Sequence, residues 1–241
     1  EIVLYGKASF DGKEKKSIFR HICDKNRDFL YEVAIDYYGV EITYDELIKN
    51  VDTNAKVLTW LGVEKNDVIT ICSPNVPSSI YFYFAAQEIG AVPSMMHVYS
   101  SPEEMKRYLT VEKSKIVIMI GMNQPKRNLQ SILDDTSVKK VVVIPLNDSL
   151  DCSCMESMKT KLGIGFLGTK VGSRLLKNEG ARFDMPSDER FITHKECICQ
   201  SKNQEVIKSY TEISTIIHTG GTTGMGKSTL LKHENINRND D

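Results

Sequence analysis

Short, continuous runs of hydrophobic residues recur along the chain and predict buried β-strands. The clearest runs cover residues 68–72, 91–95, 115–120 and 140–144, and a β-branched run covers 212–218. Strands that are apolar along their whole length are typical of a parallel sheet that is covered on both faces.

Helical patterns lie between these strands. They cover residues 45–61, 78–88, a segment that starts at Pro102, and a short stretch near 128–133. Trp60, in the amphipathic first helix, is expected in the core. The alternation of strands and helices predicts the α/β class, with an open, mainly parallel sheet and helices on both faces.

A loop rich in glycine and threonine follows the last of these strands. Residues 219–228 are T-G-G-T-T-G-M-G-K-S. The glycines let backbone amides turn toward one anion, and the threonine hydroxyls and the lysine ammonium add donors. We therefore predict a loop that binds the phosphates of a nucleoside triphosphate at the carboxyl end of a strand, rather than a flexible glycine linker. The predicted phosphate-binding residues are Thr219, Gly220, Gly221, Thr222, Thr223, Gly224 and Lys227.

Two families fit this loop. Residues 221–228 match G-x-x-x-x-G-K-[ST] of the P-loop NTPases, in which Ser228 would hold magnesium and a helix would start at Lys227. The loop also resembles T-[SG]-G-[ST]-T-G-x-P-K-G of the adenylate-forming superfamily, and the H-x-N of that family follows at 233–235. Gly226 and Ser228 depart from this second pattern.

Position along the chain favours the second family. Only 13 residues follow Ser228, whereas a P-loop domain normally carries its loop after its first strand. Upstream segments at 40–47, 61–68, 73–77 and 89–93 resemble the adenylate-forming motifs T-Y-x-E-L, L-G-V-x-x-G-D-x-V, P-N-x-P and L-G-A-V-x-P. The resemblance runs from about Tyr44 to Asn235 and is weakest between 147 and 190.

The resemblance implies an acid–thiol ligase that forms AMP. Such enzymes use ATP and Mg²⁺ to make an acyl-AMP and then pass the acyl group to a thiol, here coenzyme A. Lys227, the catalytic candidate, would stabilise the departing pyrophosphate. Residues 90–104 look most similar to bacterial acyl-CoA synthetases, so a fatty or other aliphatic carboxylic acid is the expected substrate.

The resemblance also implies that residues 1–241 form a truncated N-terminal domain, with the C-terminal domain absent and residues 145–190 a surface excursion. The chain alone is expected to be inactive. Two alternatives stay open: a P-loop NTPase or kinase that uses Gly221–Ser228, and a non-catalytic nucleotide-binding module. The full reading frame would distinguish them.

Composition narrows the class of protein. Hydrophobic residues make up 41% and charged residues 26%, and the net charge of −1 argues against nucleic-acid binding. No apolar run approaches the ~20 residues of a membrane span, and the N-terminus is no signal peptide. Six cysteines are too few for a disulfide scaffold, so a cytoplasmic location is expected. The basic segment 157–178 is expected to be a solvated excursion, with weak contact to a membrane surface as the alternative.

Cysteines and histidines offer few further candidates. Two C-x-C pairs, Cys152/Cys154 and Cys197/Cys199 with His194 nearby, raise the possibility of zinc, but the spacing is unusual and no metal site is predicted. His218 either borders the nucleotide or simply ends the strand. His233, in the H-x-N, is expected to form a structural hydrogen bond, and His21, His97 and His194 show no catalytic spacing.

Overall fold

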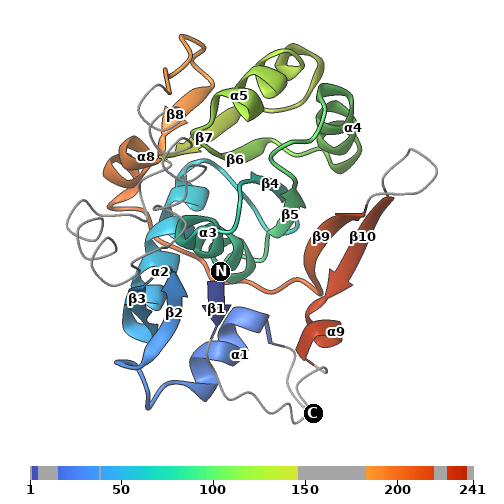
Figure 1. The fold of residues 1–241 in the computed structure, drawn as a ribbon. Coiled ribbons are helices and arrows are strands. Elements are labelled where there is room, and N and C mark those ends of the chain that lie inside the picture. Colours follow the sequence, from blue (N-terminus) through green and yellow to red (C-terminus); the bar gives the residue numbers. More distant parts are fainter. Residues whose placement is uncertain (1, 5–15, 38, 146–182, 220–226, 238–241) are drawn as a thin grey trace.

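The computed structural model describes residues 2–4, 16–37, 39–145, 183–219 and 227–237 (Figure 1). In chain order, the described elements are β1 (Ile2–Leu4), α1 (Ile18–Lys25), β2 (Val33–Tyr37), β3 (Val40–Thr43), α2 (Tyr44–Trp60), β4 (Val68–Cys72), α3 (Pro77–Glu88), β5 (Val92–Met96), α4 (Pro102–Glu112), β6 (Ile116–Ile120), α5 (Asn123–Gln130), the 3₁₀ helix η1 (Leu133–Asp135), β7 (Lys140–Ile144), β8 (Phe191–Thr193), α8 (His194–Ser201), β9 (Ile213–Thr219), β10 (Lys227–Lys232) and α9 (His233–Asn237).

The main sheet contains seven strands in the order β10-β9-β5-β4-β6-β7-β8. All neighbouring pairs are parallel except β9 and β10. From β4 the chain first passes to the strand on one side, β5, and then crosses over β4 to the strand on its other side, β6. Because crossovers between parallel strands are right-handed, α3 lies on one face of the sheet and α4 and α5 lie on the other. Helix α2 packs against α3 and α8, and α4 packs against α5 (Figure 1). The predicted fold class, an open and mainly parallel sheet with helices on both faces, is confirmed.

The central strands form the core. Ile69 and Ile71 of β4, Ile118 and Ile120 of β6, and Val142 of β7 are fully buried. Each such side chain contributes about 1.5–3 kcal/mol through its removal from water. The apolar runs of the sequence therefore correspond to strands that are covered on both faces.

Helix α2 packs one face on this core. Its buried residues include Leu47, Val51 and Leu58, which follow the spacing of one helical face. Trp60 lies two residues beyond Leu58, so it points away from that face, and 37% of its surface is exposed. The prediction that Trp60 lies in the core is wrong. The helix expected near 128–133 is also displaced, since α5 ends at Gln130 and η1 follows.

Three turns explain segments on which the family resemblance depends. Thr43 and Glu46 form a capping box at the start of α2. Asn66 has a φ of 67°, the left-handed conformation that asparagine tolerates. Gly90 has a φ of 74°, and its carbonyl accepts a hydrogen bond from the Asn66 amide at 2.8 Å, which fixes the entry into β5.

A second, small sheet is formed by residues that precede the main sheet in the sequence. Strands β1, β2 and β3 pair in antiparallel fashion and in sequence order. No strand was predicted in this part of the chain. The β2–β3 connection turns at Gly39, whose φ is 83° and whose amide donates to Asp36 Oδ1 at 2.8 Å.

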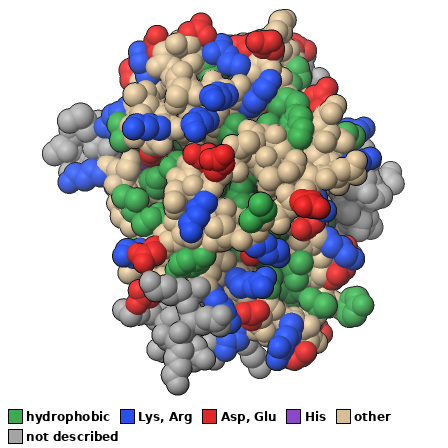
Figure 2. Space-filling model, turned by 180° about the vertical axis from the view of Figure 1, so that it is seen from behind, with side chains coloured by type: hydrophobic (Ala, Val, Ile, Leu, Met, Phe, Trp, Pro, Cys, Tyr) green, Lys and Arg blue, Asp and Glu red, His purple; other side chains and the backbone are tan. Residues whose placement is uncertain are grey.

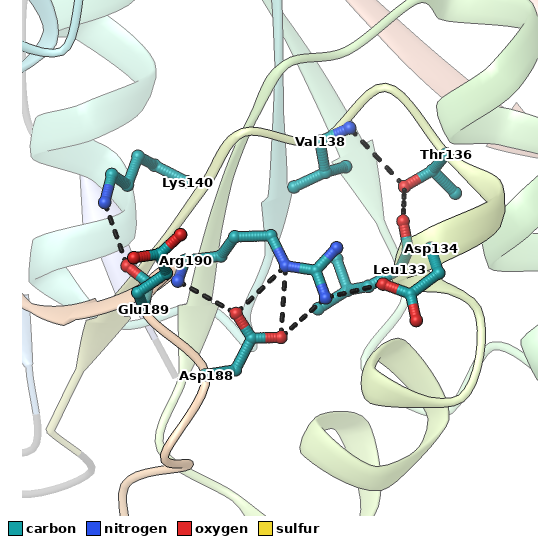
Figure 3. Close-up of polar contacts among 8 residues, drawn as sticks. All are labelled: Leu133, Asp134, Thr136, Val138, Lys140, Asp188, Glu189 and Arg190. Carbon is teal, nitrogen blue, oxygen red and sulfur yellow. Dashed lines mark hydrogen bonds and ion pairs between the residues drawn. The ribbon is translucent and has the colours of Figure 1, made fainter.

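Polar contacts around Arg190 hold the outer strand β8 in place (Figure 3). Arg190 Nε and Nη2 donate to the carboxylate of Asp188 at 2.6–3.0 Å, and Nη2 also donates to Asp134 Oδ1 at 2.8 Å. Lys140 Nζ donates to the carbonyl of Glu189 at 2.9 Å. These contacts attach the segment before β8 to η1 and β7. The predicted excursion at 145–190 falls mostly on residues 146–182, outside the described residues, and stays a prediction, as does the basic segment 157–178.

Charges of both signs lie on the face of the molecule that Figure 2 draws. Figure 2 shows acidic and basic side chains interspersed on one face, with hydrophobic side chains in separate small groups. Within the described part of the chain, no helix combines the length and the apolar character that crossing a bilayer requires.

Candidate phosphate-binding site

The predicted phosphate loop lies at the tip of a β-hairpin. Thr219 is the last residue of β9 and Lys227 the first of β10, and the two residues are directly paired. Both ends of the loop are therefore placed next to each other. The predicted phosphate-binding residues Gly220, Gly221, Thr222, Thr223 and Gly224 lie outside the described residues, so the assignment of the site stays a prediction.

The hairpin places the loop at the carboxyl edge of the parallel sheet. β9 runs parallel to β5, with Ser94 opposite Ile216 and Met95 opposite Ile217. The loop begins where β9 ends, and open α/β sheets bind ligands at the carboxyl ends of their strands. The expected position of the loop at the end of a strand is confirmed.

The conformation after the loop separates the two families. A P-loop would start a helix at Lys227. Instead, Lys227–Lys232 forms the strand β10, and the next helix, α9, begins only at His233. Ser228 is part of this strand and lies within hydrogen-bonding distance of His218. The P-loop alternative on Gly221–Ser228 is therefore wrong.

Buried polar contacts fasten β9 to the body of the protein. Gln87 Nε2 of α3 donates to the Ser214 carbonyl at 3.3 Å and to Ser214 Oγ at 3.1 Å. Thr215 Oγ1 donates to the carbonyl of Pro93 in β5 at 2.9 Å. Gln87, Ser214 and Thr215 are all buried. These bonds anchor the first residues of β9.

His218, near the end of β9, connects the hairpin to two other elements, β5 and α4. Its Nε2 lies 3.0 Å from Ser94 Oγ of β5 and 3.4 Å from Glu112 Oε1 at the end of α4. Its Nδ1 lies 3.1 Å from Ser228 Oγ of β10. The ring stacks on Tyr108 of α4, with 3.7 Å between the centroids and 18° between the planes. His218 thus ends the strand as the sequence suggested, but with its ring turned into contacts among three elements.

Burial disfavours charge on both members of the His218–Glu112 pair. The side chains of His218 and Glu112 are 6% and 4% exposed. Burial lowers the pKa of His218, with a further lowering from the charge of Arg107, and burial raises the pKa of Glu112. Neither oxygen of Glu112 accepts a well-oriented hydrogen bond within the described residues.

Sequence reasoning missed Ser94, Tyr108 and Glu112. They lie more than 100 residues from His218, in a strand and a helix that the parallel crossovers bring beside β9. No local pattern marks them. Only the position of His218 directly before the loop gave a signal.

The H-x-N segment after β10 has a structural role. His233 is 1% exposed, and its Nδ1 accepts a hydrogen bond from the Ile18 amide of α1 at 3.1 Å. Asn235 Oδ1 accepts from the Lys232 amide at 3.1 Å. The prediction of a structural hydrogen bond at His233 is confirmed. Burial lowers the pKa of His233 to about 4.

The other histidine and cysteine candidates are not drawn into a site. His194 Nε2 lies 2.7 Å from Asn54 Oδ1 in the interior. Cys197 is buried and Cys199 exposed, on different sides of α8, while Cys152 and Cys154 lie outside the described residues. In the part of the chain that is described, no group of three or more His, Cys, Asp or Glu side chains could hold a metal ion.

Comparison with known proteins shows which family and which relatives the chain is similar to. The sequence model described as "AMP-binding enzyme" matches residues 23–240. A long-chain-fatty-acid–CoA ligase of Bacillus subtilis (strain 168) is 22% identical over 231 residues, which cover 92% of this chain and 37% of that protein.

Two solved structures share the fold. A long-chain-fatty-acid–CoA ligase from Archaeoglobus fulgidus has a TM-score of 0.64 and 18% identity, and the match covers 99% of this chain and 41% of that one. An anthranilate CoA ligase in complex with anthranoyl-AMP has a TM-score of 0.62 and 15% identity, with 87% and 34% covered. The chain thus spans well under half the length of these relatives.

Proposed function

Since the chain belongs to the AMP-binding enzyme family, we propose that the full natural protein uses ATP to activate a carboxylic acid and then transfers the acyl group to coenzyme A. The observation that carries this proposal is the family match over residues 23–240, together with a hairpin that sets Thr219 opposite Lys227 at the carboxyl edge of the sheet. The coenzyme A ligases among the relatives support the choice of acceptor.

In the first half-reaction, a carboxylate oxygen of the acid attacks the α-phosphorus of ATP. The bond from that phosphorus to the bridging oxygen breaks, and pyrophosphate leaves with the electron pair. In the second, the thiol sulfur of coenzyme A attacks the acyl carbon, the thiol proton is lost to water, and AMP leaves. Mg²⁺ would neutralise charge on the phosphates.

The loop residues would act by electrostatic stabilisation. Gly220, Gly221 and Gly224 would let backbone amides face the phosphates, and the hydroxyls of Thr219, Thr222 and Thr223 would add donors. Lys227 is the first residue of β10 and is paired directly with Thr219, so it stands at the end of the loop opposite the start. There it would stabilise the charge that develops on pyrophosphate.

The substrate we propose is a fatty or other aliphatic acid. Residues 90–104 resemble bacterial acyl-CoA ligases, and two of the relatives are fatty-acid ligases by name. The anthranilate ligase makes an aryl acid the competing choice. Cytoplasmic location fits this substrate and the composition.

The test is acid-dependent exchange of pyrophosphate into ATP and coenzyme A-dependent AMP release by the full natural protein, with a panel of fatty, aryl and amino acids. We expect a fatty acid to be preferred. Preference for an amino acid, or AMP release without coenzyme A, would contradict the proposal. Nucleotide binding without acid-dependent exchange would favour the non-catalytic module instead.

A variant of Lys227 tests the loop. Lys227→Ala should lower kcat at least about 10-fold while the KM for the acid changes little, because the charge is needed as pyrophosphate departs. Lys232→Ala is the matched control, since Lys232 lies at the other end of the same strand in an ion pair with Glu212 at 3.3 Å. An equal loss in both variants would argue against a role for Lys227 in the reaction.

A further inference from the structure

The two ends of the predicted phosphate loop extend beyond the main-chain ladder that holds the hairpin to the sheet. Pairing between β5 and β9 comprises Ser94 with Ile216 and Met95 with Ile217. The chain then continues through His218 to Thr219. In Figure 1 the β9–β10 hairpin extends outward past β5. The last residues before the loop therefore need support from side chains.

The His218 ring supplies contacts of this kind in three directions. It reaches Ser94 of β5 at 3.0 Å, Ser228 of β10 at 3.1 Å and Glu112 of α4 at 3.4 Å. His218 directly precedes Thr219, and Ser228 directly follows Lys227. One ring thus ties both strands of the hairpin, each within one residue of the loop, to the sheet and to a helix.

Helix α4 holds the ring itself. Tyr108 stacks on it, and the Arg107 guanidinium lies 4.8 Å from the centroid of the Tyr108 ring on the same helix. Glu112, one turn further along, faces Nε2. The His218 Nε2 faces both Ser94 Oγ and Glu112 Oε1, while Nδ1 faces Ser228 Oγ, so the orientation of the ring decides which strand each nitrogen contacts.

We propose that His218 is a positioning residue, oriented by Glu112 and Tyr108, which fixes the two ends of the phosphate loop relative to the sheet. It acts through Thr219 and Lys227 and not on the substrate. Its contribution to catalysis rests on the proposed function. Its contribution to the order of the hairpin does not.

The first test needs no activity. Amide hydrogen exchange is compared between the wild-type protein and His218→Phe, which keeps an aromatic ring against Tyr108 but loses the bonds to Ser94 and Ser228. We expect faster exchange at 216–219 and 227–230, with β4 and β6 unchanged. Glu112→Gln, which keeps the size of the side chain, should produce a smaller increase in the same segments. Unchanged exchange in the hairpin of both variants would overturn the proposal.

The second test uses the proposed reaction. His218→Phe should lower kcat about 10-fold or more, while the KM for the acid changes less than about 2-fold, because misplacement of groups that act in the transition state lowers turnover. Glu112→Gln should show the same split with a smaller loss. Should His218→Phe fail to fold, Glu112→Gln decides by itself in both tests.

The matched control is His194→Phe. His194 is also buried and also forms a histidine hydrogen bond, at 2.7 Å to Asn54, but it lies in α8 and away from the hairpin. This variant should lower the thermal midpoint without the kcat effect. A loss of kcat in His194→Phe equal to that in His218→Phe would reduce the effect to general destabilisation and overturn the proposal. If the wild-type protein shows no acid-dependent exchange, the proposed function fails while the hydrogen-exchange test still judges the positioning role.

Discussion

Two parts of one sheet are built on different principles. Every residue of the central strand β6 is buried, so the strand is covered on both faces. In β10, at the edge of the same sheet, residues 227–230 are exposed, and Leu230 shows 59% of its surface. β6 is held by burial, whereas β10 pairs with β9, and β9 is held by a short pairing with β5 and by a few polar side chains.

The contrast agrees with the phosphate-binding role that we propose for the loop. A scaffold gains stability from apolar area removed from water, about 25 cal/mol per Å². A loop that receives a charged phosphate must stay accessible to water, so it cannot be fixed in that way. Contacts such as Gln87–Ser214, Thr215–Pro93 and the His218 ring take over that role. The loss of any one should affect the hairpin more than the sheet.

The largest expected effect compares the two parts directly. Ile118→Ala should lower the free energy of unfolding by about 2–5 kcal/mol, because it opens a cavity in a fully buried site. Leu230→Ala, at an exposed position in β10, should change it by no more than about 0.5 kcal/mol. Urea denaturation followed by circular dichroism measures both. Equal losses would show that the hairpin is as well packed as the centre.

Acid should weaken the protein through His233, which links the end of the hairpin to α1. Burial lowers the pKa of His233 to about 4, from 6.5 in the unfolded chain. The unfolded chain therefore binds more protons between these values, so the free energy of unfolding falls as the pH falls from 6.5 toward 4, by at most about 3 kcal/mol.

His233→Asn can accept from the Ile18 amide but cannot take up the proton, so its stability should decline less over the same pH window. The exposed His97, whose Nδ1 accepts from the Tyr99 amide at 3.2 Å, provides the control variant His97→Asn. Stability curves of wild type and His233→Asn that run parallel from pH 7 to pH 4 would exclude this role of His233.

The sequence predicted the central strands better than it predicted the hairpin. The strands at 68–72, 116–120 and 140–144 could be located because burial on both faces leaves a continuous apolar run. The end of the loop could not, because one of the two patterns that the loop satisfied starts a helix at Lys227 and the other does not specify the structure of residues 227–232. Only the pairing with β9 distinguishes them.

Contacts between distant residues were also beyond the sequence. Ser94, Glu112 and His218 meet because β9 returns beside β5 after the chain has built the other half of the sheet. Nothing in the local composition of α4 marks Glu112 as a partner of His218. Trp60 shows the reverse failure, since its residue type favoured the core while its position on α2 turned it outward.

The turn at Gly90 leads into β5, which lies between the centre of the sheet and the hairpin. An added methyl group at Gly90 should destabilise this turn. Gly90 has a φ of 74°, and a Cβ at this position would lie 3.0 Å from Ser209 Cβ and 3.2 Å from the Ser209 carbonyl carbon. Gly62 has a φ of 77° with no atom within 4 Å of such a Cβ. Gly62→Ala should therefore cost only the left-handed conformation, about 1–2 kcal/mol.

Gly90→Ala should cost more, because Ser209, whose amide donates to the Glu88 carbonyl at 2.9 Å, must move as well. Ser209 lies in the segment that leads into β9, so the hairpin should show faster hydrogen exchange in Gly90→Ala but not in Gly62→Ala. Equal losses of stability in the two variants would mean that this segment yields freely and does not help to place β9.

The smallest effect compares two buried threonines with matched substitutions. Thr215 Oγ1 donates to the Pro93 carbonyl at 2.9 Å, between β9 and β5, and Thr70 Oγ1 donates to Ser114 Oγ at 2.9 Å beneath the centre of the sheet. Each change to valine keeps the shape and removes the hydroxyl that donates this hydrogen bond, so each should cost about 1 kcal/mol. The two should differ in where the loss is felt. Because central strands open only with the whole fold, Thr70→Val should speed exchange throughout the sheet. Thr215→Val should speed it chiefly in β9 and β10, which are held by separate contacts. Uniform exchange across the sheet in Thr215→Val would show that hairpin and centre unfold as one unit, and the distinction between them would then be one of exposure alone.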